Sequence, residues 1–134
     1  MHHALQDINL WAVLVAAASA FMLGGLWYGP LFKHVWCREA GVDPDAAPKH
    51  PASVFGTAFV LSLVAAAAFA LYLGPAPELR HALQAGLYVG AAFVATSFGI
   101  NYAFAQRSLR LWLIDGGYHT LQFVLYGLVL GLWH

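Results

Sequence analysis

Residues 8–28 read INLWAVLVAAASAFMLGGLWY and contain no charged side chain. The hydrocarbon core of a bilayer is about 30 Å thick, which an α-helix of about 20 apolar residues can cross. Three further stretches have similar length and character, at 52–73, 82–106 and 111–133. Helices are the expected form of all four, because backbone groups in lipid have no water to bond with. The sequence therefore predicts one all-α domain, residues 1–134, built as a transmembrane four-helix bundle.

The composition excludes several classes of protein. Hydrophobic residues make up 61% of the chain and charged residues only 9%, against about 25% charged in an ordinary soluble domain. Such a chain is not disordered, and it has too few polar side chains to cover a globule in water. Six Lys and Arg balance six Asp and Glu, which leaves no basic surface for nucleic acid. We therefore expect membrane lipid, and no nucleic acid, around this protein.

The loops between the predicted spans differ in positive charge. Five Lys and Arg residues lie in the first and third loops and one lies in the second: Lys33, Arg38, Lys49, Arg107 and Arg110, against Arg80. Cytoplasmic loops of membrane proteins carry an excess of Lys and Arg. We therefore expect these two loops in the cytoplasm and both termini on the other side of the membrane.

The first loop and the glycines carry further patterns. Apolar residues at 31, 32, 35 and 36 surround Lys33 and His34 at helical spacing, which predicts a short interfacial helix after span one. GxxxG patterns at Gly25–Gly29, Gly86–Gly90 and Gly127–Gly131 indicate close helix contacts, within the chain or between copies. Four short helices enclose little volume, so we also expect a homo-oligomer.

The predicted fourth span carries a stripe of polar residues. Asp115, His119, Gln122 and Tyr126 follow one another at i, i+4, i+7 and i+11, which places all four on one helical face. A charged side chain at the centre of a membrane helix costs about 2.5–3.5 kcal/mol on insertion scales. An ionisable residue inside a span is therefore a candidate functional residue by default.

This stripe has two interpretations. In the structural one, Asp115 pairs with Arg107 or Arg110 and fixes the helix start, while His119 is a hydrogen-bonded core residue. In the functional one, the stripe lines a cavity near the cytoplasmic face, and Asp115 with His119 holds a proton, a small ion, or a polar or lipid ligand. Trp27, Tyr28, Asn101 and Tyr102 are expected at the same depth. The candidate binding residues are Asp115, His119, Asn101, Gln122, Tyr126, Trp27 and Arg107.

The sequence holds no HExxH metal motif, no phosphate-binding glycine loop and no GxSxG nucleophile. We therefore predict no metal site and no cofactor, and assign no catalytic residue. Two other motifs are distinctive: WYGPLF at 27–32, and RSL at 107–109 followed by LIDGGYH at 113–119. On these motifs the sequence resembles the DUF1761 family of small bacterial and fungal membrane proteins. The resemblance implies four helices, here in a bacterial inner membrane, and supplies no substrate.

Three functions fit these features. The first is a small transport or channel-like protein, with Asp115 as the charge site, His119 as its proton-responsive neighbour, and Asn101 and Tyr126 in the lining. The second is a membrane-embedded enzyme or a binder of lipid or small ligands, in which Asp115 orients His119 as a general base. The third is an assembly subunit without a site of its own.

Overall fold

The chain is helical. A computed structural model describes residues 7–45 and 51–134, and every regular element within these ranges is a helix. This confirms the all-α prediction. In chain order the elements are α2 (Leu10–Leu26), η1 (Trp27–Leu31), α3 (Lys33–Ala40), α4 (Pro51–Leu73), α5 (Leu79–Tyr88), η2 (Val89–Ala95), α6 (Thr96–Phe104) and α7 (Leu109–Leu132), where η1 and η2 are π-helical turns.

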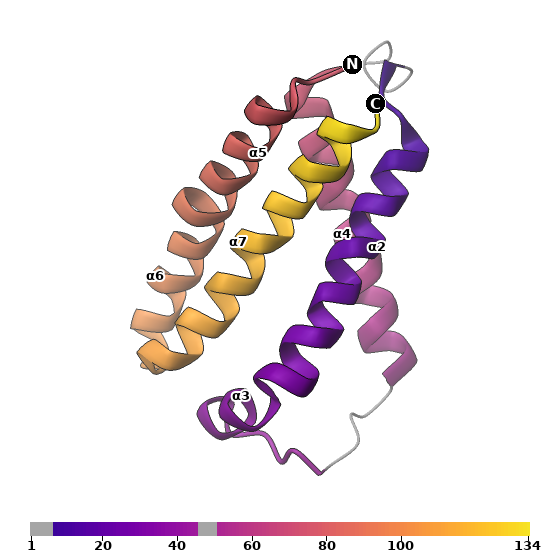
Figure 1. The fold of residues 1–134 in the computed structure, drawn as a ribbon. Helices are drawn as coiled ribbons and strands as arrows, with labels where there is room; N and C mark the ends of the chain where they lie inside the picture. Colours follow the sequence, from indigo (N-terminus) through magenta and orange to yellow (C-terminus); the bar gives the residue numbers. More distant parts are fainter. Residues whose placement is uncertain (1–6, 46–50) are drawn as a thin grey trace.

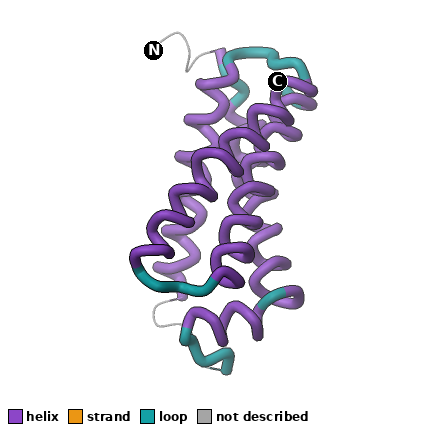
Figure 2. Tube along the Cα trace, turned by 90° about the vertical axis from the view of Figure 1, so that its left-hand side faces the viewer, coloured by secondary structure: helices purple, strands orange, loops and turns teal. Residues whose placement is uncertain are grey.

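Helix α7 is at the centre of the packed helices. It contacts the continuous rod formed by α5, η2 and α6 on one side, and α2 on the other. Helix α4 packs mainly against α2 and also touches α7. The start of α2 and the end of α7 lie together at one end of the molecule, and α3 lies at the opposite end with the α6–α7 turn (Figures 1 and 2).

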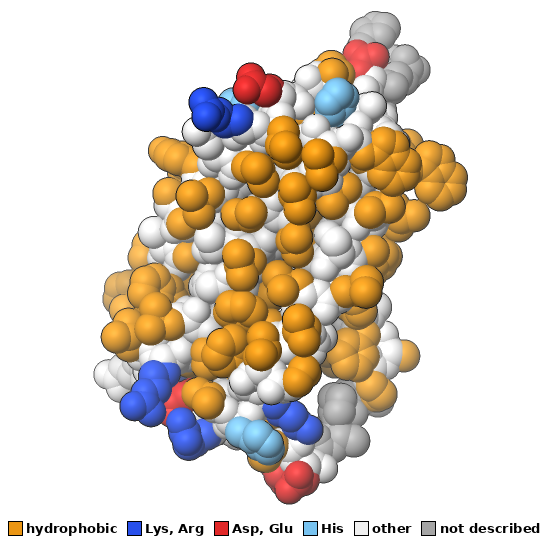
Figure 3. All heavy atoms as spheres, viewed as in Figure 1, with side chains coloured by type: hydrophobic (Ala, Val, Ile, Leu, Met, Phe, Trp, Pro, Cys, Tyr) orange, Lys and Arg blue, Asp and Glu red, His pale blue; other side chains and the backbone are white. Residues whose placement is uncertain are grey.

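Three helical segments are long and apolar enough to cross a membrane: Leu10–Leu31, Pro51–Leu73 and Leu79–Phe104. Helix α7 is equally long, but Asp115, His119 and Gln122 make it more polar. Hydrophobic side chains cover the middle of the face shown in Figure 3, and charged side chains gather toward its two ends. The three apolar segments and this distribution are compatible with an integral membrane protein.

The helix boundaries agree with the predicted spans to within three residues at each end. The difference at the end of span one has a clear cause, because Pro30 is accommodated inside the π-helical turn η1 and the helix continues to Leu31. The chain then bends at Phe32, where φ is −127° and ψ is 12°. Helix α3 follows and ends at Gly41, whose φ of +74° is the left-handed conformation that commonly closes a helix.

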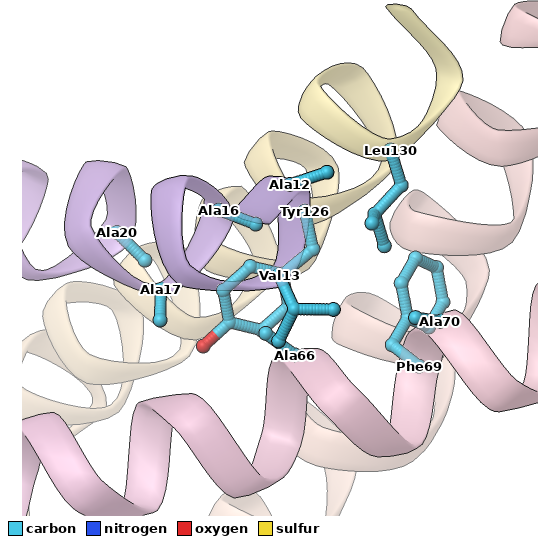
Figure 4. Close-up of a cluster of buried hydrophobic side chains, with 10 residues drawn as sticks. All are labelled: Ala12, Val13, Ala16, Ala17, Ala20, Ala66, Phe69, Ala70, Tyr126 and Leu130. Carbon is cyan, nitrogen blue, oxygen red and sulfur yellow. The ribbon is translucent and has the colours of Figure 1, made fainter. Parts of the chain in front are cut away.

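Small residues allow α2 to approach its neighbours closely. Its buried side chains are four alanines and one valine: Ala12, Val13, Ala16, Ala17 and Ala20. They pack with larger side chains from the other helices, including Phe69 of α4 and Tyr126 of α7 (Figure 4). Lipid tails are as apolar as these side chains, so the attraction between membrane helices relies on such close van der Waals contact.

Two of the three GxxxG patterns lie at one interface inside the chain. A methyl group added at Gly86 would lie 2.3 Å from the Phe123 carbonyl oxygen, and one at Gly127 would lie 2.3 Å from the Ala82 carbonyl oxygen. The expectation of a glycine-mediated helix contact is confirmed for α5 and α7. In contrast, a methyl group at Gly25 would meet nothing within 4 Å.

We predict that Gly86→Ala lowers the free energy of unfolding by about 1–3 kcal/mol, because the added methyl group forces two backbones apart. Gly25→Ala is the matched control, and it is expected to be neutral or slightly stabilising, since alanine favours a helix. Thermal unfolding in detergent, followed by circular dichroism, measures both. Equal stability of the two variants would contradict the close packing of α5 on α7.

Candidate functional site

The polar stripe on α7 faces packed protein over most of its length. Asp115 is 7% exposed and Gln122 8% exposed, while Tyr126 is fully buried. His119 is partly buried. The predicted sharing of one helical face is therefore correct. However, the stripe separates into two hydrogen-bonded groups, one around Asp115 and one that begins at His119.

The Asp115 carboxylate accepts hydrogen bonds from three aromatic side chains. The Tyr28 hydroxyl donates to Oδ1 over 2.6 Å, and the Trp36 indole N–H donates to the same oxygen over 3.0 Å. The Tyr102 hydroxyl donates to Oδ2. These donors come from η1, α3 and α6. One carboxylate thus joins three other elements to α7.

Local structure brings the three donors together. Ser108 caps the start of α7, since its hydroxyl accepts from the Leu111 N–H over 3.1 Å, and the short turn before it places the end of α6 beside Asp115. On the other side, the indole N–H of Trp27 donates to the Ile114 carbonyl oxygen over 2.9 Å. This bond fixes η1 against α7 next to the carboxylate, and α3 follows directly.

Neither arginine near the start of α7 pairs with Asp115. Within the described ranges one ion pair has a nitrogen–oxygen distance of 4.0 Å or less. It joins Arg38 Nε to Glu39 Oε2, at 3.6 Å. Arg107 and Arg110 are exposed. The arginine pair of the structural interpretation is therefore not found, whereas His119 is hydrogen-bonded to Gln122, as that interpretation expected. The groups that donate to the Asp115 oxygens are all uncharged.

A polar contact also links α3 to the start of α7 at the surface. The hydroxyl of Ser108 beside Glu39, together with the positive charges of Arg38 and Arg110, holds the pKa of the Glu39 carboxyl below its usual value. Glu39 lies in α3 and Ser108 directly precedes α7. Glu39 therefore lies close to the start of α7, and α3 is in contact with α7.

A second chain of hydrogen bonds starts at His119 and crosses the core. His119 Nδ1 lies 2.6 Å from Gln122 Oε1, and Gln122 Nε2 donates to the Tyr126 hydroxyl over 2.6 Å. That hydroxyl lies 2.6 Å from Ser62 Oγ of α4, which donates to the Ala17 carbonyl oxygen of α2 over 3.3 Å. The chain gives these buried polar groups hydrogen-bond partners within the protein.

Six aromatic rings are packed one against the next, and the first and the last of them belong to residues that donate hydrogen bonds to Asp115. Neighbouring rings in this series have centroids 4.8–5.8 Å apart. We call these residues the aromatic cluster; in order they are Trp36, Tyr28, Tyr118, His119, Phe98 and Tyr102. His119 belongs both to this cluster and to the second hydrogen-bonded chain.

The structure brings some predicted site residues together and separates others. Asn101 and Arg107 are exposed on the outer surface, away from the carboxylate. Trp27 contacts the backbone next to Asp115. The sequence pattern did not predict that Trp36, Tyr118 and Ser62 belong to these networks. The one available signal was that Ser62 is among the few polar residues of an apolar span. Among the described residues, no group of three or more His, Cys, Asp or Glu side chains is arranged to hold a metal ion.

We predict that Tyr126→Phe lowers the free energy of unfolding by about 1–3 kcal/mol, because it leaves the Gln122 amide N–H without its buried acceptor and leaves the Ser62 hydroxyl only its longer bond to the Ala17 carbonyl oxygen. Tyr72→Phe is the control, since Tyr72 is 70% exposed, and it should leave stability unchanged. Unfolding of the purified variants in detergent measures the difference. A Tyr126→Phe protein as stable as the control would show that the chain of hydrogen bonds does not stabilise the fold.

The family described as "Protein of unknown function (DUF1761)" matches residues 11–131 of the chain. This range includes α2 through nearly all of α7, and with them every residue of the aromatic cluster. No curated protein and no solved structure matches the chain. By the extent of the family match, the chain belongs to the DUF1761 family.

Proposed function

We propose that this protein is a small transporter of the bacterial inner membrane, in which Asp115 binds a positively charged species. Its four spans are Leu10–Leu31, Pro51–Leu73, Leu79–Phe104 and α7. The single observation that carries the proposal is a buried carboxylate inside an apolar protein with no basic partner among the described residues. Such a charge needs a proton or a cation to balance it in a medium of low dielectric constant.

The polar stripe does not argue against α7 as the fourth span. Its carboxylate, amide and phenol are bonded by protein groups and turned away from the surroundings. Hydropathy treats these groups as if they faced lipid, and so it understates how well the helix fits a membrane. Helix α7 also runs the same length as its neighbours and lies between them (Figure 1).

The proposed orientation in the membrane follows from the distribution of Lys and Arg between the two ends of the molecule. The end of the molecule with α3 and the α6–α7 turn holds Lys33, Arg38, Arg107 and Arg110, and the other end holds Arg80. By the positive-inside rule the first end is cytoplasmic, so Asp115 lies close to the cytoplasmic face and both termini lie outside.

The segment formed by η1 and α3 covers Asp115 from the cytoplasmic end. Tyr28 and Trp36, which donate to Oδ1, both belong to this segment. Its first part is a π-helical turn that contains Pro30, and such turns often mark functional sites in helices. Movement of this one segment would remove two of the three donors and open the carboxylate to the cytoplasm.

The alternative, a membrane-embedded enzyme, receives less support from the geometry. It requires Asp115 to orient His119 as a general base. Both oxygens of Asp115 are bonded to other side chains, and Nδ1 of His119 is bonded to Gln122. The two residues therefore belong to separate hydrogen-bonded groups.

Reporter fusions test the topology. A fusion to alkaline phosphatase, which is active outside the cytoplasm, should be active after His134, and a fluorescent-protein fusion, which matures in the cytoplasm, should be fluorescent after Asp45. Fluorescence from a fusion after His134 would contradict the assignment of α7 as the fourth span.

Proton movement in vesicles tests the proposed role of Asp115 in transport. Purified protein is placed in liposomes that hold a pH-sensitive dye, and a panel of inorganic and organic monovalent cations is added outside. We expect at least one cation to drive proton release through the wild-type protein. Asp115→Asn, which keeps the shape of the side chain and loses its charge, should reduce the rate to that of protein-free liposomes.

The control is Asp45→Asn, because Asp45 is an exposed carboxylate outside the helices, and it should retain the wild-type rate. Two results would contradict the proposal. One is an Asp115→Asn rate equal to that of wild type. The other is a wild-type protein that moves no protons with any cation of the panel.

A further inference from the structure

The surroundings of Asp115 restrict which cation it can bind. Divalent metal ions take six or more oxygen ligands, or several His, Cys and carboxylate groups in a fixed geometry. Within the described ranges Asp115 belongs to no group of three or more His, Cys, Asp or Glu side chains that could form such a set. A lone carboxylate surrounded by aromatic rings therefore lacks the ligands that a hard metal ion requires.

The same surroundings suit a cation whose charge is spread over an organic group. Ammonium, guanidinium and quaternary ammonium groups are attracted to the faces of aromatic rings within about 6 Å, and clusters of such rings are the usual protein site for quaternary ammonium. The aromatic cluster supplies six rings, three of which belong to the donors of Asp115.

Resting on the proposed function, we infer that the ligand of Asp115 is an organic cation, bound by the carboxylate and by the aromatic cluster. The bound cation takes the place of the tyrosine and tryptophan donors at the carboxylate oxygens. Their rings then turn from donating hydrogen bonds to flanking the positive group.

The position of the cluster agrees with this role. Phe98 and Tyr102 come from α6, Tyr28 and Trp36 from η1 and α3, and His119 from α7. Because the rings come from elements on different sides of α7, a ligand among them would link η1 and α3 to α6 and α7. An ordinary aromatic belt at the membrane surface would instead place its rings outward, toward the headgroups.

Calorimetric binding to the full-length protein in lipid nanodiscs tests the inference. The probes are choline and tetraethylammonium, with 3,3-dimethylbutan-1-ol as the uncharged isostere of choline. We expect both cations to bind and the alcohol not to bind. Asp115→Asn should weaken binding of the cations by about a hundredfold, as expected for removal of one partner of a buried charge pair. Asp115→Glu keeps the charge and should keep binding.

A matched pair of substitutions on α6 tests the role of the rings. Phe98 belongs to the cluster and does not bond Asp115, whereas Phe104 is 87% exposed on the same helix. Phe98→Leu should weaken binding by about tenfold through the loss of one ring face, and Phe104→Leu should leave it unchanged. Melting curves of both variants check that each is folded.

Failure of this inference can be told from failure of the proposed function. If the organic cations do not bind while the vesicles still show proton movement that depends on Asp115, the ligand class is wrong and the charge site stands. Equal binding by Phe98→Leu and Phe104→Leu would likewise overturn the role of the aromatic cluster. Equal binding of choline and its uncharged isostere would show that the site recognises shape and not charge.

Discussion

One buried carboxylate organises the end of this protein at which α3 and the α6–α7 turn lie. Asp115 accepts hydrogen bonds from Tyr28, Trp36 and Tyr102, and through them α7 holds η1, α3 and α6. Breaking a buried polar contact in a membrane protein leaves groups that no water can satisfy, so the three donors and the carboxylate depend on one another. The same carboxylate lacks a basic partner in the described structure, which is the physical reason for assigning it a ligand.

The two halves of the molecule are stabilised in different ways. Toward the ends where the termini lie, α5 and α7 meet through glycines such as Gly86 and Gly127, and α2 packs through alanines, so backbone approach and van der Waals contact dominate. Toward the end with α3 and the α6–α7 turn, aromatic rings and hydrogen bonds replace this close packing. Contacts of the first kind give a rigid frame. Contacts of the second kind can be exchanged for those of a ligand, because rings and hydroxyl groups can turn without moving a helix axis.

The sequence predicts the helices well and the site only in part. Long apolar stretches predict the helix boundaries to within three residues, and the period of α7 places Asp115, Gln122 and Tyr126 on one face. The rotation of span three was not predictable, because a helix that faces lipid on one side and protein on the other is apolar on both. As a result Tyr102 points at Asp115, while its neighbour Asn101 is exposed. Trp36 was not predictable either, since its position depends on the π-helical turn and on the bend at Phe32.

The most direct test of the central role of Asp115 is hydrogen–deuterium exchange of the protein in nanodiscs. Asp115→Leu removes both acceptor oxygens, whereas Asp115→Asn keeps one. Amide exchange in Lys33–Ala40 should become much faster in Asp115→Leu and change little in Asp115→Asn, while Leu79–Tyr88 should stay protected in both. Unchanged exchange of Lys33–Ala40 in Asp115→Leu would contradict this role, because it would show that the carboxylate does not hold η1 and α3 against α7.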